Sequence, residues 1–122
     1  MRTFLRLLLI LLLLLGNSHL HADPPITLQI RGHAGMAPHT FLATVVVERH
    51  DQNRVLCLRW GLVEEQGYNS SCTTLEGAQE PRMRQFRRTL EEPGIWDVMA
   101  EVSRSDGSRH RAVQQITVMG GM

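Results

Sequence analysis

The most constraining feature of the sequence is an alternation of apolar and polar residues within Gly94–Val118. Successive side chains of a strand point to opposite faces of a sheet, so a period of two predicts half-buried strands. The two alternating runs are separated by Ser105–Ser108, a Ser-Asp-Gly-Ser turn signal. The stretch therefore predicts a β-hairpin, and its inward-facing residues are expected to be Trp96, Val98, Ala100, Val102, Ile116 and Val118.

Shorter runs rich in apolar and β-branched residues predict further strands upstream. They lie at Ile26–Ile30, Phe41–His50 and Arg54–Trp60, with a Gly/Pro-rich loop at Gly32–His39 and a polar loop or hairpin at Gly61–Gly77. Arg82–Leu90 is ambiguous between a helical turn and a strand, and we favour a strand that ends near Arg88. The expected core residues of these strands are Phe41, Ala43, Val45, Val47, Leu56, Leu58 and Trp60. About seven short strands with frequent turn signals and no helical period predict an all-β fold, a β-sandwich.

The N-terminus has the parts of a secretory signal peptide. Arg2 and Arg6 supply positive charge, Leu7–Leu15 is an unbroken apolar run, and Ala22 ends a plausible cleavage site. The run is about half the roughly 20 residues that a membrane-spanning helix needs, so a retained anchor is the weaker alternative. We expect residues 1–22 to be removed, leaving residues 23–122 as a single domain, periplasmic or secreted, with no stable membrane span.

Cys57 and Cys72 are the two cysteines of the chain. Because exported proteins meet an oxidising compartment, we expect a disulfide between them. The loop-entropy relation gives a bridge of this spacing a stabilisation of about 3 kcal/mol. A redox-active or metal-binding pair is the alternative interpretation, although the spacing is too long for a CxxC motif.

Charge and motifs argue against several function classes. The chain has 13 Lys+Arg and 12 Asp+Glu residues, and removing Arg2 and Arg6 leaves 11 against 12, a net charge of −1. A nucleic-acid role therefore has no electrostatic support. The sequence contains no GxSxG or HExxH motif, and the adjacent pairs Glu64-Glu65 and Glu91-Glu92 would point to opposite faces of a strand. We therefore expect no catalytic residues and no cofactor, and we predict that the protein is not an enzyme.

The final third of the chain resembles the closing hairpin of bacterial PKD-like and related immunoglobulin-like domains. The resemblance rests on Pro93–Val102, Ser105-Asp106-Gly107 and Ile116-Thr117-Val118, with Arg59-Trp60-Gly61 similar to the third strand of such domains. Phe86 stands where an aromatic residue precedes their Pro-Gly turn. The resemblance implies an immunoglobulin-like sandwich and a role in adhesion, carbohydrate association or surface display.

Two groups of residues are candidate binding sites. His33, Met36 and His39 offer two imidazoles and a thioether within one loop, a donor set that suits copper. An ordinary loop with solvated imidazoles is the simpler interpretation. Tyr68, with Glu64 and Glu65, would present an aromatic ring in a disulfide-bounded loop and could bind a partner.

The sequence alone therefore predicts a non-catalytic interaction or structural module of the bacterial cell envelope. Its partner would be an unknown protein or glycan, bound through loops and sheet edges. A periplasmic copper-binding protein using His33, Met36 and His39 is one alternative. A small secreted enzyme inhibitor that presents the disulfide-tethered loop is another.

Overall fold

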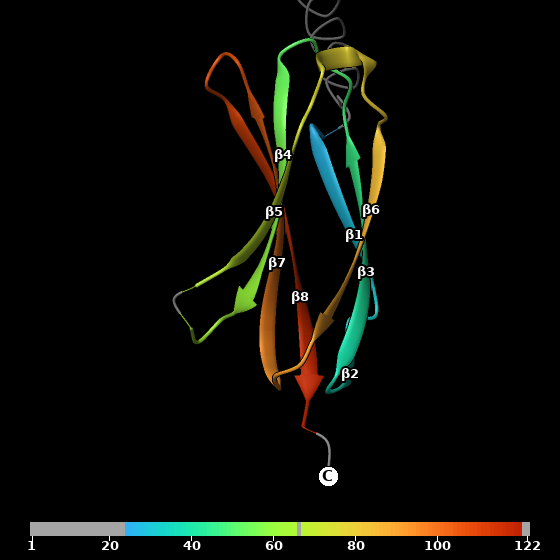
Figure 1. The fold of residues 1–122 in the computed structure, drawn as a ribbon, viewed down its shortest axis with the longest axis vertical. Helices are drawn as coiled ribbons and strands as arrows, with labels where there is room; N and C mark the ends of the chain where they lie inside the picture. The colour runs from blue at the N-terminus through green and yellow to red at the C-terminus, as the bar shows by residue number, and fades with distance from the viewer. Residues whose placement is uncertain (1–23, 66, 121–122) are drawn as a thin grey trace, which may run out of the picture.

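The computed structural model describes residues 24–65 and 67–120 (Figure 1). The expected signal peptide and its cleavage site at Ala22 lie outside the described residues. The regular elements are eight β-strands and one short 3-10 helix. They are β1 (Ile26–Arg31), β2 (Ala34–Met36), β3 (His39–Val47), β4 (Asn53–Leu62), β5 (Asn69–Thr74), η1 (Gly77–Gln79), β6 (Met83–Leu90), β7 (Gly94–Arg104) and β8 (Arg109–Met119).

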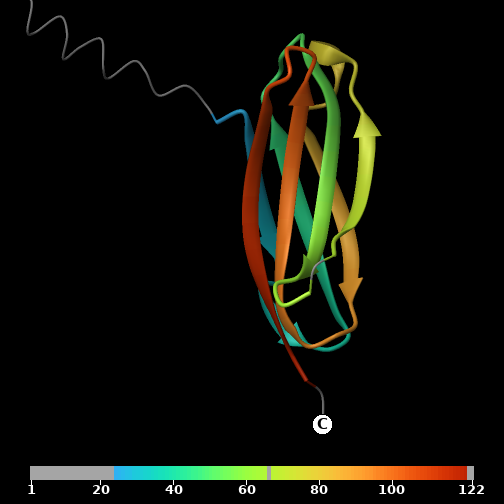
Figure 2. The same ribbon diagram turned by 90° about the vertical axis from the view of Figure 1, so that its left-hand side faces the viewer.

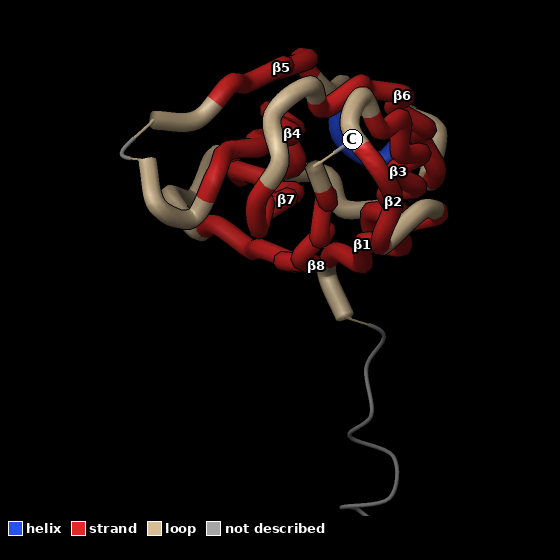
Figure 3. Tube along the Cα trace, turned by 90° about the horizontal axis from the view of Figure 1, so that it is seen from below, coloured by secondary structure: helices blue, strands red, loops and turns tan. Residues whose placement is uncertain are grey.

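The strands form two sheets that face each other. One is three-stranded in the order β1-β3-β6, and the other is five-stranded in the order β2-β8-β7-β4-β5. All neighbouring strands are antiparallel except the short β2, which runs parallel to β8. Figure 2 shows the five-stranded sheet in front of the other, and the view along the strands in Figure 3 shows both layers end on.

The core lies between the sheets because one face of each is apolar. Each fully buried Leu, Ile, Val or Phe side chain contributes roughly 1.5–3 kcal/mol relative to leaving it in water. The central strands β3, β4 and β7 supply most of these residues. The buried apolar cluster consists of Ile26, Leu28, Ile30, Phe41, Ala43, Val45, Val47, Leu56, Leu58, Leu75, Leu90, Trp96, Val98, Ala100, Val102, Ile116 and Val118.

The predicted all-β sandwich and its closing hairpin are confirmed. Strand β7 pairs with β8 in a register that sets Trp96 opposite Ile116, and every residue expected on its inner face is buried. The expected core positions of β3 and β4 are also buried, except that Trp60 is only partly buried and packs against the edge of the cluster. No helix among the described residues has the length and apolar character needed to cross a membrane.

The structure differs from the sequence prediction at two short strands. Residues 34–36 were expected to be loop but form β2 on the edge of β8, and residues 69–74 form β5 where a polar loop or hairpin was considered. The strand count is therefore eight rather than about seven. Neither segment has an alternation of apolar and polar residues that would have predicted a strand. Both are edge strands of mostly small or polar residues, which bury little surface and are defined by their backbone pairing.

Strand β6 is one of the two edges of the three-stranded sheet and carries three arginines, Arg84, Arg87 and Arg88. Arg84 forms a 2.6 Å ion pair with Glu80, which precedes the strand. The guanidinium of Arg88 lies 5.3 Å from the ring centroid of Trp60, so this arginine covers the partly buried indole by a cation–π contact. The edge is therefore basic along its length.

The hairpin turn is held by a carboxylate as well as by glycine. Gly107 has φ +88°, which an L-residue adopts with difficulty. Asp106 Oδ1 accepts hydrogen bonds from the Ser108 hydroxyl at 2.6 Å and from the Ser108 amide at 2.8 Å. These two hydrogen bonds hold the pKa of the Asp106 carboxyl below its ordinary value, and the one from the Ser108 hydroxyl has the larger effect.

This pKa shift predicts a pH-dependent contribution of Asp106 to stability. A carboxyl whose pKa is lowered on folding stabilises the fold above its unfolded pKa of about 3.9, and the contribution is lost as pH falls through the lower folded value. We expect Asp106→Ala to lower the urea midpoint at neutral pH and to differ less from the native chain in strong acid.

Asp51→Ala is the matched control, because the Asp51 carboxylate makes no hydrogen bond or ion pair with the residues that the structure describes. An equal loss of stability for Asp106→Ala at both pH values would contradict the assignment.

Candidate functional site

The candidate site is the disulfide on the outer face of the five-stranded sheet. Cys57 of β4 and Cys72 of β5 are directly opposite each other in the antiparallel register, and their sulfur atoms are bonded at 2.10 Å. The expected disulfide is therefore confirmed. It points outward because Leu56 and Leu58, on either side of Cys57, face the core and the strand alternates.

The two sulfur-bearing residues differ in exposure. Cys57 is only 7% exposed, whereas Cys72 is exposed, since β5 is the edge strand of its sheet. Strand β5 consists of small polar residues around Cys72, and none of them is charged. A molecule approaching from solvent therefore meets Cys72 before Cys57, and no bulky neighbour on β5 obstructs it.

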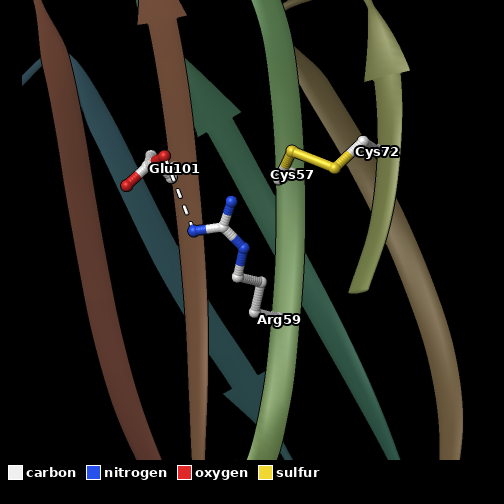
Figure 4. The surroundings of a disulfide bond; sticks show 4 residues. All are labelled: Cys57, Arg59, Cys72 and Glu101. Carbon is white, nitrogen blue, oxygen red and sulfur yellow. Dashed lines mark ion pairs between the residues drawn. A yellow bond between two sulfur atoms is a disulfide. The ribbon is translucent and has the colours of Figure 1, made fainter. Parts of the chain in front are cut away.

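A buried carboxylate lies next to the disulfide. Glu101 of β7 is opposite Cys57 in the β4–β7 register and is only 3% exposed. Arg111 of β8 donates from Nε to Glu101 Oε2 at 2.7 Å, and Arg59 of β4 approaches Oε1 with its Nη1 at 3.7 Å. In Figure 4 the disulfide extends from β4 toward β5, while Arg59 extends the other way toward Glu101.

The two arginines compensate the burial of the carboxylate. Removing one partner of a buried ion pair is strongly destabilising, because it leaves an uncompensated charge in a poorly solvated position. Glu101 has two partners, and they are solvent-accessible, with side-chain exposures of 36% for Arg59 and 55% for Arg111. We call Arg59, Glu101 and Arg111 the charged triad; it has a net charge of +1, with its anion buried and its cations exposed.

The sequence did not point to Glu101 as a site residue. Alternation along β7 places it on the outer face, where a carboxylate is ordinarily solvated. Its burial depends on Arg59 and Arg111 coming from strands on both sides of β7, which only the sheet order provides. The available signal was the Cys57-x-Arg59 spacing on one strand face, which places a cation beside a cysteine.

The predicted metal-site residues lie in and beside β2, between the end of β1 and the start of β3. His39 Nε2 is 2.7 Å from the carbonyl oxygen of Gly32, and its ring packs over Gly35. Nδ1 of His33 is 3.5 Å from the carbonyl oxygen of Gln115, and Met36 is 54% exposed. Within residues 24–65 and 67–120, no group of three or more His, Cys, Asp or Glu is placed to hold a metal ion. Copper binding by these residues stays a sequence-based prediction.

The predicted partner-binding residues follow the end of β4, which is at the same end of the five-stranded sheet as β2 (Figure 1). Tyr68 is 50% exposed, and its ring lies against Gly61, where an added Cβ would be 2.8 Å from Cδ1 of the tyrosine. Glu64 and Glu65 are exposed. Glu65, Trp60 and Trp96 are among the residues that line a cleft of about 310 Å³. The three side chains do not converge on one pocket, and their partner-binding role stays a prediction.

Comparison with known proteins identifies the fold but no family. No family model matches the chain, and no curated protein matches it. Among solved structures, the chain is similar to superoxide reductase (neelaredoxin) from Ignicoccus hospitalis. One such structure has 16% identity, a TM-score of 0.60, and coverage of 79% of this chain and 81% of that chain. A second has 17% identity, a TM-score of 0.55, and coverage of 78% and 82%.

These likenesses overturn the predicted family. The neighbours belong to a β fold different from that of a PKD-like immunoglobulin domain, so the assignment to PKD-like domains is wrong. The residues behind it, an alternating strand, an Asp-Gly turn and a second alternating strand, occur wherever two antiparallel strands have one buried face. They identify a hairpin and do not distinguish one sandwich family from another.

The functional predictions drawn from that assignment are also wrong. A non-catalytic binding module of the envelope conflicts with the neighbours, which are enzymes, and the prediction that this chain is not an enzyme is contradicted by the same comparison. The copper-binding and inhibitor alternatives fit the neighbours no better. The residues that the structure describes do not fit a metal centre either. Both cysteines are bonded to each other, and no group of three or more His, Cys, Asp or Glu among these residues is placed to hold a metal ion.

The disulfide predicts a measurable share of stability. It closes a loop with a sequence separation of 15, for which the loop-entropy relation gives about 3 kcal/mol. We expect a Cys57→Ser/Cys72→Ser variant to melt more than about 10 °C below the oxidised protein and to remain folded at room temperature. Thermal circular dichroism measures both. An unchanged melting temperature would contradict the stabilising role of the disulfide. A variant that is unfolded at room temperature would contradict the expectation that the protein stays folded without the disulfide.

Proposed function

We propose that the protein is a redox protein whose working group is the Cys57–Cys72 pair, which alternates between a disulfide and a dithiol. The observation that carries the proposal is the position of the pair: a disulfide on the outer face of an edge strand, with Cys72 exposed and a charged triad beside Cys57. A disulfide that served only as a staple would not need an accessible sulfur.

The exchange takes two steps. A thiolate from solvent attacks the accessible sulfur of Cys72, the Sγ–Sγ bond breaks, and Cys57 leaves as a thiolate. A second external thiolate attacks the resulting mixed disulfide at the external sulfur, which releases Cys72 and an external disulfide. Two external thiols are oxidised and the protein disulfide is reduced to two thiols, so electrons and protons balance.

The surroundings of Cys57 suit a leaving thiolate. A neighbouring arginine favours the thiolate over the thiol, and Arg59 is two residues away on the same strand face. The carboxylate of Glu101 opposes this effect, but it is paired with Arg111 at 2.7 Å. The looser 3.7 Å contact leaves Arg59 as the cation that can respond to a negative charge on Cys57.

The expected compartment and the fold neighbours support a redox role. The proposed signal peptide at residues 1–22 would deliver the single domain of residues 23–122 to the periplasm or outside the cell, where thiol–disulfide exchange takes place. The neighbours with the same fold are named superoxide reductases, which are redox enzymes.

The proposal predicts a disulfide that exchanges within the range of biological thiols. Structural disulfides have reduction potentials below about −300 mV, whereas exchanging ones lie above this value. We expect the Cys57–Cys72 disulfide to equilibrate with glutathione buffers at a potential above about −300 mV, measured from the fraction of protein that maleimide labels after acid quenching. A potential below that range would mean that the disulfide is only structural.

Single-cysteine variants test the order of attack. Cys72 in Cys57→Ser should form a mixed disulfide with oxidised glutathione faster than Cys57 does in Cys72→Ser, because Cys57 is 7% exposed. Equal rates would contradict Cys72 as the entry point.

A second candidate function is oxidation of the dithiol by superoxide, which the names of the fold neighbours favour. Two superoxide ions, two protons and one dithiol would give one disulfide and two molecules of hydrogen peroxide. Each superoxide takes one electron and each sulfur loses one, so the step balances.

Pulsed superoxide tests this candidate. We expect reduced protein to form one disulfide for every two peroxides above the yield of spontaneous dismutation, with Cys57→Ser/Cys72→Ser as the inactive control. Peroxide yields that are equal for the two proteins would exclude this reaction and would leave thiol exchange unaffected.

A further inference from the structure

The charged triad presents a cationic surface to solvent beside the disulfide. Its anion, Glu101, is 3% exposed, whereas Arg59 and Arg111 are 36% and 55% exposed. The buried carboxylate is screened from solvent by the two guanidinium groups that bind it. An approaching molecule therefore contacts the two exposed arginines, whereas the carboxylate of Glu101 is almost inaccessible to it.

The other charged residue of β8 on this part of the outer face is Arg109, which is exposed and opposite Ser103 in the β7–β8 register, so it adds a cation rather than an anion. Strand β5, on the other side of Cys57, consists of Asn69–Thr74 and is uncharged. The next acidic residue on the outer face of β7 is Asp97, four positions from Glu101, or roughly 13 Å along the strand. That separation exceeds the Debye length of about 8 Å at physiological salt. The local field at the disulfide is therefore dominated by the cations of the triad together with Arg109.

We propose that the external thiol that exchanges with Cys57–Cys72 is a small anionic thiol, one that carries a carboxylate or sulfonate besides its sulfur. The inference rests on the proposed thiol–disulfide function and names its substrate class. Arg59 and Arg111 attract the anionic group of such a thiol while its sulfur reaches the exposed Cys72. A cationic thiol is repelled from the same surface, and a small thiol suits the approach to Cys72 along β5, whose residues are small and polar.

The size of the preference follows from Coulomb's law. A unit charge held roughly 7 Å from another in water changes a rate by about threefold, and an anionic and a cationic probe differ by two such units. We therefore expect a rate ratio of roughly five- to tenfold at low salt, falling toward one at about 1 M salt, where the Debye length is about 3 Å.

The test compares three thiols of similar size: mercaptoethanesulfonate, mercaptoethanol and cysteamine. Their rates of reduction of the full oxidised protein are measured by quenched maleimide labelling at low and high salt. Each rate is divided by the thiolate fraction of the reagent, because thiol acidity differs among the three. We expect the order sulfonate, neutral, ammonium at low salt, with the differences suppressed by salt.

Two variants and a control locate the effect. Arg59→Gln should lower the sulfonate-to-ammonium ratio by roughly five- to tenfold, to near one, and Glu101→Gln should raise it, since it removes the opposing charge. Arg87→Gln, on β6 of the other sheet, should leave the ratio unchanged. The salt dependence of the native chain needs no substitution and therefore remains a test if a variant fails to fold.

The outcomes separate this inference from the function beneath it. Equal corrected rates for the three thiols, or a faster reaction of cysteamine, would overturn the preference for anionic thiols and leave disulfide exchange intact. Failure of all three thiols to reduce the folded protein would overturn the proposed function itself. A salt-independent ratio would show that the preference is not electrostatic and would likewise overturn the inference.

Discussion

Burial of one face of each sheet against the other is the constraint on which the rest of the molecule depends. Val98, Ala100 and Val102 on β7 are fully buried, and Leu56 and Leu58 on β4 are at most 1% exposed. Because side chains alternate along a strand, fixing these residues inward fixes their neighbours outward. The disulfide and the charged triad are therefore on the outer face as a direct result of core packing. A one-residue slip of β4 would bury the cysteine and the arginine and expose the leucines.

The sequence is informative where a strand is half buried and much less so elsewhere. The hairpin of β7 and β8 could be predicted because its inner residues recur with period two. Strand β5 could not, since Asn69–Thr74 has no apolar residue to show a period, and only its pairing with β4 makes it a strand. The same holds for β2, whose three residues are defined by hydrogen bonding to β8.

The candidate site was likewise predictable in part from the sequence. The disulfide was predictable from two cysteines and an oxidising compartment, and its outward direction from the leucines beside Cys57. The burial of Glu101 was not, because besides Arg111 of the hairpin it requires Arg59 of β4, a strand far from β7 in the sequence and next to it in the sheet. Pairwise patterns along one strand predict faces, whereas a site built across three strands requires the strand order.

The basic edge formed by β6 has a consequence for how copies of the protein behave at high concentration. A free edge strand exposes unpaired amide and carbonyl groups, which can pair with the edge of another molecule and extend the sheet without limit. If two copies met along β6, the arginines of one chain would come close to those of the other, and like charges at such contacts are unfavourable. The arginines that cover Trp60 and pair with Glu80 thereby also oppose pairing of two copies along this edge.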